Sequence, residues 1–238
     1  MNKKEKKKNP LKLKACIVAL SLWGLSAPFA LSSSPVMAAE TASNVAQEQV
    51  AMALFNKGVY LGNLHRYEEA LAAYNDVITR FGNSQNTKIQ EQVAKALNNK
   101  EVALHDLNRY EEAIATYNDV ITHFGNSQDK IIQESVAMAL FNKGGDLYDL
   151  NRYEEALAAY NDLITRFGNS QDTTIQEQVA KALNNKGQIL TNLHRYEEAF
   201  VTYNELIILF SDLSYDPKIQ ELLATARYHL LGLKMILS

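Results

Sequence analysis

Paired carboxylates are the feature of this chain that comes closest to a catalytic pattern. Glu68-Glu69 recurs as Glu111-Glu112, Glu154-Glu155 and Glu197-Glu198. Two carboxylates can divide general acid and base roles, but adjacent positions on a helix do not face each other. Each pair also stands in the first turn of an expected helix, where negative charge complements the helix dipole. We therefore interpret these pairs as structural.

The histidines form no set that could bind a metal or perform acid-base chemistry. His65 and His194 align with Asn108 and Asn151 in a turn between expected helices, a position that tolerates left-handed backbone geometry. The other three have no partner at ligand spacing: His105, His123 and His229. No zinc-protease, phosphate-loop, calcium-loop or Ser/His/Asp motif is present. The sequence predicts no enzyme, no cofactor and no metal site.

The first 38 residues have the order of a bacterial secretory signal peptide. Seven lysines within residues 1–14 precede an apolar run at 15–31, and small residues follow up to Ala38 and Ala39. We expect export by the general secretory route and cleavage after Ala38 or Ala39, with a retained membrane anchor as the alternative. The run is shorter than the ~20 residues of a spanning helix, which favours cleavage. The expected location is periplasmic or secreted.

Removal of this segment changes the charge of the chain. It takes away seven lysines and one glutamate, so the formal net charge falls from −3 to −9. Such an acidic protein is a poor candidate for nucleic acid, whose phosphates require basic patches. The single cysteine, Cys16, is removed as well, which excludes thiol chemistry in the mature chain. No later stretch is apolar enough for membrane insertion, so we expect a soluble mature protein.

A fixed repeat governs the rest of the chain. The phrase Arg-Tyr-Glu-Glu-Ala or a close variant places a tyrosine every 43 residues, at Tyr67, Tyr110, Tyr153 and Tyr196. Apolar residues at spacings of three, four and seven in residues 89–107 predict one helix of about 19 residues in each repeat. A second stripe, Ala70, Tyr74, Val77 and Phe81, predicts the helix that follows. The chain is therefore an array of helix pairs.

Local signals place the ends of these helices. Thr-x-x-Gln sequences at Thr87 and Thr173 resemble capping boxes at the start of the first helix. Gly82, Gly125 and Gly168 stand where a left-handed residue would end the second helix. Proline is absent between Ala39 and Asp216, as a nearly all-helical array requires.

The repeat resembles the tetratricopeptide repeat family over roughly residues 44–213. The family's small residue matches Gly58, Gly144 and Gly187; its alanine matches Ala70, Ala113, Ala156 and Ala199; its aromatic residue matches Tyr74, Tyr117, Tyr160 and Tyr203. The resemblance implies an all-α, right-handed α-solenoid. We expect four repeats at about 43–85, 86–128, 129–171 and 172–214, followed by a capping helix at 215–238.

Two features depart from the family pattern. The period is 43 residues, whereas that of the family is usually 34, so the first helix of each repeat and the loop before it are longer. Glu101 stands where the other copies have glycine. A carboxylate in a tight helix contact is costly if it has no partner, so we expect a local opening or rotation at the second repeat.

The resemblance also implies a concave groove, lined by the first helix of each repeat, that binds an extended peptide or a partner helix. Carried over residue by residue, the lining is Met52, Phe55, Asn56, Lys95, Asn98, Asn99, Met138, Phe141, Asn142, Lys181, Asn184 and Asn185. One asparagine recurs in every repeat and could either pair with a peptide backbone or bond the neighbouring helix. The Met/Phe pairs could be apolar patches or ordinary core, and the two lysines favour a ligand with carboxylates.

These observations lead to two hypotheses about function. The first is an exported bacterial scaffold or adaptor that binds a protein or peptide of the cell envelope in the groove. The alternative is a self-assembling structural protein, because the end of the chain, residues 230–237, is more apolar than a solvated cap requires. That segment could fold back on the fourth repeat or form a homodimer contact. An accessory module of an enzyme is a third possibility.

Overall fold

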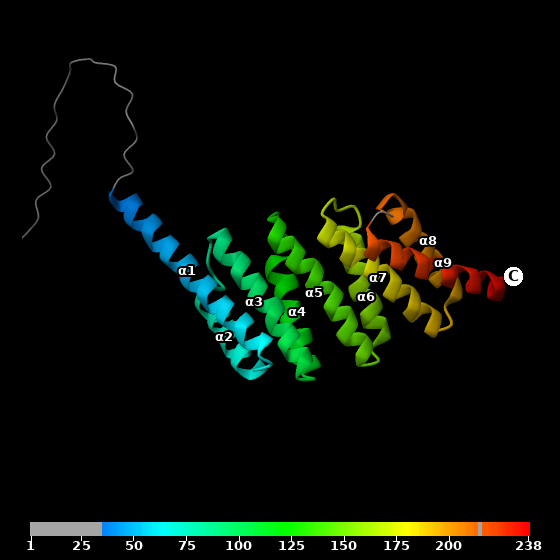
Figure 1. The fold of residues 1–238 in the computed structure, drawn as a ribbon, viewed down its shortest axis with the longest axis horizontal. Helices are drawn as coiled ribbons and strands as arrows, with labels where there is room; N and C mark the ends of the chain where they lie inside the picture. Colours follow the sequence, from blue (N-terminus) through cyan, green and yellow to red (C-terminus); the bar gives the residue numbers. More distant parts are fainter. Residues whose placement is uncertain (1–34, 214–215) are drawn as a thin grey trace, which may run out of the picture.

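The computed structural model describes residues 35–213 and 216–238. Within these residues the chain forms a row of α-helices that follow one another in space as in the sequence (Figure 1). The helices are α1 (Pro35–Asn63), α2 (Tyr67–Phe81), α3 (Thr87–Asp106), α4 (Tyr110–Phe124), α5 (Lys130–Asp149), α6 (Tyr153–Phe167), α7 (Thr173–Asn192), α8 (Tyr196–Phe210) and α9 (Pro217–Leu237), with a short 3-10 helix, η1 (Ser211–Leu213), before α9. Most of the predicted signal peptide lies outside the described residues, and both predicted cleavage positions fall inside α1.

The helices form two layers. The A helices (α1, α3, α5, α7 and α9) pack side by side, each against the next A helix. Each B helix (α2, α4, α6 and α8) packs only between the two A helices that flank it in the sequence, and in the described residues no B helix contacts another. The A layer is therefore the tighter, inner side of the solenoid. This architecture confirms the predicted all-helical array of helix pairs with a C-terminal helix at its end.

Helices α3 and α7 begin at Thr87 and Thr173, as the sequence suggested, but their capping side chains lie one residue earlier. Asn86 and Asp172 are the N-caps of α3 and α7, and their side-chain oxygens accept hydrogen bonds from backbone N–H groups in the first turn. Asp129 and Asp216 do the same for α5 and α9. The predicted capping boxes at the following threonines are wrong, because the Asn and Asp side chains already satisfy these donors.

The turns within each repeat use left-handed residues, as predicted. His65, Asn108, Asn151 and His194 have φ angles between 56° and 60°. The glycines after the B helices are a correction: Gly82, with a φ of −54°, and its equivalents are right-handed. A Cβ on Gly82 would lie 2.6 Å from the carbonyl oxygen of Ile78, so a close approach of the backbone explains the glycine.

The core lies between the two layers and includes Glu101, while the opening or rotation expected at the second repeat stays a prediction. The side chain of Glu101 is completely buried, and Tyr117 opposite it is also buried. The Asn142 side chain of the next A helix donates a hydrogen bond of 3.0 Å to Glu101 Oε1, so the carboxylate is accommodated by a partner from the neighbouring repeat.

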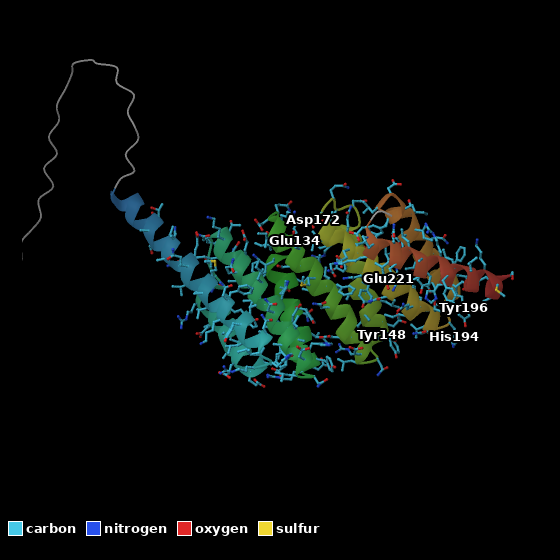
Figure 2. All side chains as sticks on the ribbon, viewed as in Figure 1. Glu134, Tyr148, Asp172, His194, Tyr196 and Glu221 are labelled. Atoms are coloured by element: carbon cyan, nitrogen blue, oxygen red, sulfur yellow. The ribbon has the colours of Figure 1, made fainter. Side chains whose placement is uncertain are left out.

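Charged side chains join successive repeats along the edge of the array. Arg152 contacts Glu155 in its own helix and Glu111 of the preceding repeat, at 2.6 Å and 3.1 Å. Arg109 and Arg195 repeat this arrangement. At another position, Lys130 Nζ lies 2.8 Å from Asp172 Oδ2, near the labelled residues Glu134 and Asp172 in Figure 2. The acidic pairs thus have the structural role expected from the sequence.

Helix α9 folds back on the fourth repeat with one face. Ile219, Leu223, Ala226, Leu230 and Leu233 are buried in its contacts with α7 and α8. It exposes five large apolar side chains, Tyr228, Leu231, Met235, Ile236 and Leu237. Helix α9 occupies the place of an A helix, and of its apolar end only Leu230 and Leu233 fold back on the fourth repeat, so the rest of that segment is left uncovered.

Candidate functional site

The predicted groove residues lie on the A helices, with different degrees of exposure. At the N-terminal end, Met52 and Asn56 of α1 are exposed, whereas Phe55 is partly buried and its ring centroid lies 6.3 Å from that of Tyr74. Phe141 of α5 has the same relationship to Tyr160, at 6.0 Å. These two phenylalanines therefore belong partly to the core and partly to the surface.

Four of the predicted residues surround one depression between α3 and α5. Lys95, Asn98, Asn99 and Met138 line a hollow of about 200 Å³. Asn98 is largely buried, and its side-chain amide donates a hydrogen bond of 3.2 Å to the carbonyl oxygen of Ser135. Its equivalent, Asn184, is also buried. These two amides are therefore mostly enclosed between repeats and offer little surface to a ligand.

Three other predicted residues line a second hollow, also of about 200 Å³, between α3, α5 and α7. They are Phe141, Asn142 and Asn185. Asn142 donates to Glu101, and Asn185 donates to the hydroxyl of Tyr160 at 3.3 Å. These two members of the recurring asparagine row therefore bond protein groups, while Asn56 is exposed and Asn99 is partly buried.

The positive charge of Lys181 is compensated within the protein. Its Nζ lies 2.6 Å from Glu177, and the same carboxylate binds Lys218 at 2.8 Å. The hydrogen bonds from Lys181 and then Lys218 lower the pKa of Glu177. Lys181 is thus part of an ion-pair group, whereas Lys95 lines the first hollow. Of the two lysines predicted to attract a ligand with carboxylates, Lys181 therefore already has a carboxylate partner within the protein.

A buried polar cluster beside the second hollow is absent from the sequence predictions. His105 Nδ1 and Asp146 Oδ1 lie 2.6 Å apart, and the hydroxyl of Tyr117 donates to Asp146 Oδ2 at 3.2 Å. Burial raises the pKa of Asp146, although His105 opposes this effect. Burial also raises the pKa of Glu101 well above its ordinary value, with a further contribution from the charge of Asp146. His105 and Asp146 are 41 residues apart, which explains why a search for local spacing missed the pair.

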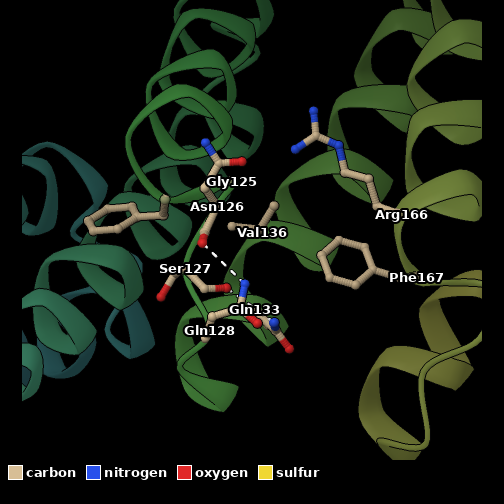
Figure 3. Close-up of a pocket in the computed structure, with 9 residues that line it drawn as sticks. Gly125, Asn126, Ser127, Gln128, Gln133, Val136, Arg166 and Phe167 are labelled. Carbon is tan, nitrogen blue, oxygen red and sulfur yellow. Dashed lines mark hydrogen bonds between the residues drawn. The ribbon is translucent and has the colours of Figure 1, made fainter.

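A third hollow lies away from the predicted groove residues. It measures about 390 Å³ and lies between the segment after α4, α5 and the end of α6 (Figure 3). Its lining comprises Phe124, Gly125, Asn126, Ser127, Gln128, Gln133, Val136, Arg166 and Phe167. The Gln133 side chain donates to the carbonyl oxygen of Ser127 at 3.1 Å, and Arg166 is held by Asp162 at 2.7 Å. Gln133 thus bonds the loop before its own helix and Arg166 bonds its own helix, so both polar groups already have partners.

None of the described helices combines the length and the apolar character that crossing a bilayer would need.

Comparison with known proteins identifies the repeat. A family model described as "Tetratricopeptide repeat" matches residues 55–130 and 133–213. A crystal structure of a tetratricopeptide repeat protein from Parabacteroides merdae has 14% identity and a TM-score of 0.54, covering 76% of this chain and 60% of that one. The chain thus spans less than two thirds of that protein, and this likeness concerns the fold alone. A structure described as "MamA RS-1 ArsTM double mutant" has 16% identity and a TM-score of 0.49, covering 79% of this chain and 96% of that one. A search of curated proteins gave no match.

Proposed function

Because the chain belongs to the tetratricopeptide repeat family, we propose that it is a non-catalytic scaffold that holds an extended peptide or a partner helix along its A-helix face. Proteins of this family generally mediate contacts between proteins. We further propose that the protein is exported and that its partner belongs to the bacterial envelope. The N-terminal charge and apolar order support export.

One observation carries the choice of face. Both hollows on the A-helix side involve α3, α5 and α7: Met138 and Phe141 provide apolar surface, and Lys95 and Asn99 provide donors. An extended chain needs apolar contacts at some positions and hydrogen-bond partners for its backbone at others. This face offers both within α3 and α5.

The test compares a groove variant with a matched variant of the outer face. The groove variant carries Lys95→Ala, Asn99→Ala and Met138→Ala, which leave the partly buried Phe55 and Phe141 in place. The control carries Asn75→Ala and Asn161→Ala, two exposed positions on α2 and α6. Each protein is immobilised and exposed to an envelope extract of the producing bacterium, after circular dichroism has verified folding.

We expect one partner to bind the unchanged protein and the outer-face control, but not the groove variant. Equal capture by all three would place the interaction elsewhere and contradict the proposal. Sequencing the N-terminus of the exported protein tests the location separately. A first residue at 39 or 40 is expected, and an intact residue 1 in a cytosolic fraction would oppose export.

Self-assembly is the second candidate, and the uncovered face of α9 favours it. Tyr228, Leu231 and Met235 are 75%, 66% and 82% exposed, a large apolar area for the end of a solenoid. Under this hypothesis, the mass measured by light scattering rises with concentration, and Leu231→Glu with Met235→Glu abolishes the rise. A concentration-independent monomer would exclude this candidate.

A further inference from the structure

Three titratable side chains that break the repeat pattern meet at one place in the structure. Glu101, His105 and Asp146 come from α3 and α5, and all three contribute to the polar cluster between these helices. The equivalent positions in the other repeats hold Gly58, Gly144 and Gly187 for Glu101; Gly62, Tyr148 and Thr191 for His105; and Tyr60, Ala103 and Ile189 for Asp146. None of these equivalents carries a carboxylate or an imidazole. The repeat scaffold therefore folds without the three groups, and its stability does not explain why they converge.

The geometry brings a nitrogen and two carboxylates to metal-binding proximity. One ligand atom each from His105, Asp146 and Asp149 lies within 4.8 Å of the others. Asp146 is held in place because Tyr117 donates to its second oxygen at 3.2 Å. A fixed carboxylate with a hydrogen-bonded outer oxygen is the arrangement that supports a metal ligand.

A buried, unpartnered oxygen behind the cluster is a second observation that points to a cation. Glu101 is 0% exposed, and only its Oε1 has a hydrogen-bond partner; Oε2 has none. A buried carboxyl oxygen without a hydrogen-bond partner is costly unless a positive charge lies beside it. A bound cation would supply this charge.

The cluster is open to solvent on one side. His105, Asp146 and Asp149 all line the second hollow of about 200 Å³, and the side chain of His105 is 43% exposed. An ion could therefore enter from the groove and keep coordination positions for water or a ligand. Asp149 is exposed and can move toward the ion at little cost.

We propose that His105, Asp146 and Asp149 bind one divalent transition-metal ion of the zinc class at the centre of the A-helix face. One imidazole nitrogen and two carboxylate oxygens form a set of three protein ligands that suits Zn²⁺ and leaves at least one open position. The ion takes the place of the proton shared by His105 and Asp146. This inference is independent of the identity of any protein partner.

The experiment titrates the full chain, without a histidine tag and after treatment with a chelator, with Co²⁺ as the spectroscopic probe and Zn²⁺ as the competitor. We expect one Co²⁺ per chain, visible absorption bands of a low-symmetry site, and displacement by one equivalent of Zn²⁺. Asp149→Asn and His105→Gln should each weaken Zn²⁺ binding at least ~10-fold. The exposed position of Asp149 keeps the first variant folded.

Two control variants separate this site from adventitious binding. Asp106→Asn removes the same charge at the equivalent position one repeat earlier, and His123→Gln removes an exposed histidine elsewhere. Both should bind Zn²⁺ like the unchanged protein. Absence of stoichiometric binding, equal affinity of the Asp149→Asn variant, or equal losses in the control variants would each overturn the proposal.

Discussion

The ring of Tyr160 occupies the space that a side chain on Gly144 would need. A Cβ built on Gly144 would lie 2.6 Å from Tyr160 Cζ, and Gly58 and Gly187 have the same relationship to Tyr74 and Tyr203. In these repeats the tyrosine of the B helix packs directly on the A-helix backbone. The second repeat has Glu101 at this position, and its tyrosine, Tyr117, bonds Asp146 of the next A helix.

The contact between Gly144 and Tyr160 leads us to expect opposite effects of alanine at Gly144 and at the adjacent Gly145. Gly144→Ala should lower the free energy of unfolding by about 1–3 kcal/mol, because the ring of Tyr160 must move. Gly145→Ala meets no atom within 4 Å and should raise it by up to ~1 kcal/mol through helix propensity. Urea unfolding followed by circular dichroism measures both. Similar values for the two variants would contradict the role assigned to Tyr160.

Glu101 predicts a stability that depends on pH. Its pKa is raised in the folded protein above the ordinary value of 4.5, so the folded state holds a proton that the unfolded state has lost. The free energy of unfolding therefore falls as pH rises above 4.5 toward the raised pKa. Glu101→Gln lacks this loss and should be more stable than the unchanged protein at about pH 8, by roughly 1–3 kcal/mol.

The same advantage should shrink at about pH 5, where the unfolded state also begins to bind the proton. Glu112→Gln is the control, and its effect on stability should depend on pH in the opposite direction, because the hydrogen bond from Arg109 lowers the pKa of Glu112. The stabilisation that ionised Glu112 contributes is present above its ordinary pKa and is lost as pH falls. Urea midpoints of both variants at the two pH values test this, and a gain for Glu101→Gln that does not change with pH would contradict the argument.

Asn151 predicts the cost of the left-handed turn. Its φ is 59°, and its side-chain oxygen accepts a hydrogen bond of 2.6 Å from the hydroxyl of Tyr153. Asn151→Val should destabilise the protein by about 1–2 kcal/mol because a β-branched residue resists this conformation. Asn151→Gly should cost less, since glycine adopts it freely. If the Asn151→Gly variant melts at a lower temperature than the Asn151→Val variant, backbone strain is not the main cause of the destabilisation.

The arginine ladder predicts coupling between repeats that depends on salt. Arg152→Ala removes contacts with Glu155 and with Glu111 of the preceding repeat, whereas Arg66→Ala removes a contact with Glu69 in its own helix. The first change should lower the melting temperature more than the second. This difference should narrow at high salt, because these groups are exposed to solvent and screened. Equal decreases in melting temperature for the two variants at low salt would show that the contact between repeats adds nothing to stability.

Local sequence was sufficient for the helices and their pairing. The apolar spacing and the left-handed positions such as Asn108 depend on neighbours within a few residues, and the 43-residue period repeats these local signals along the chain. All of these features are found in the structure. The errors are also local. The caps lie at Asn86 and its equivalents one residue before the predicted threonines, because short side chains reach the same backbone donors.

The chemistry of the A-helix face depended on contacts between repeats. Only packing of α3 against α5 brings His105 to Asp146 and gives Glu101 its partner Asn142, in both cases across 41 residues. Likewise, only the fold shows that Asn98 is enclosed and that the charge of Lys181 is compensated by Glu177. The sequence by itself determined a repeating solenoid because helix formation and capping are short-range. The tertiary structure decided which side chains remain available for binding, because burial and ion pairing are set by residues one full repeat away.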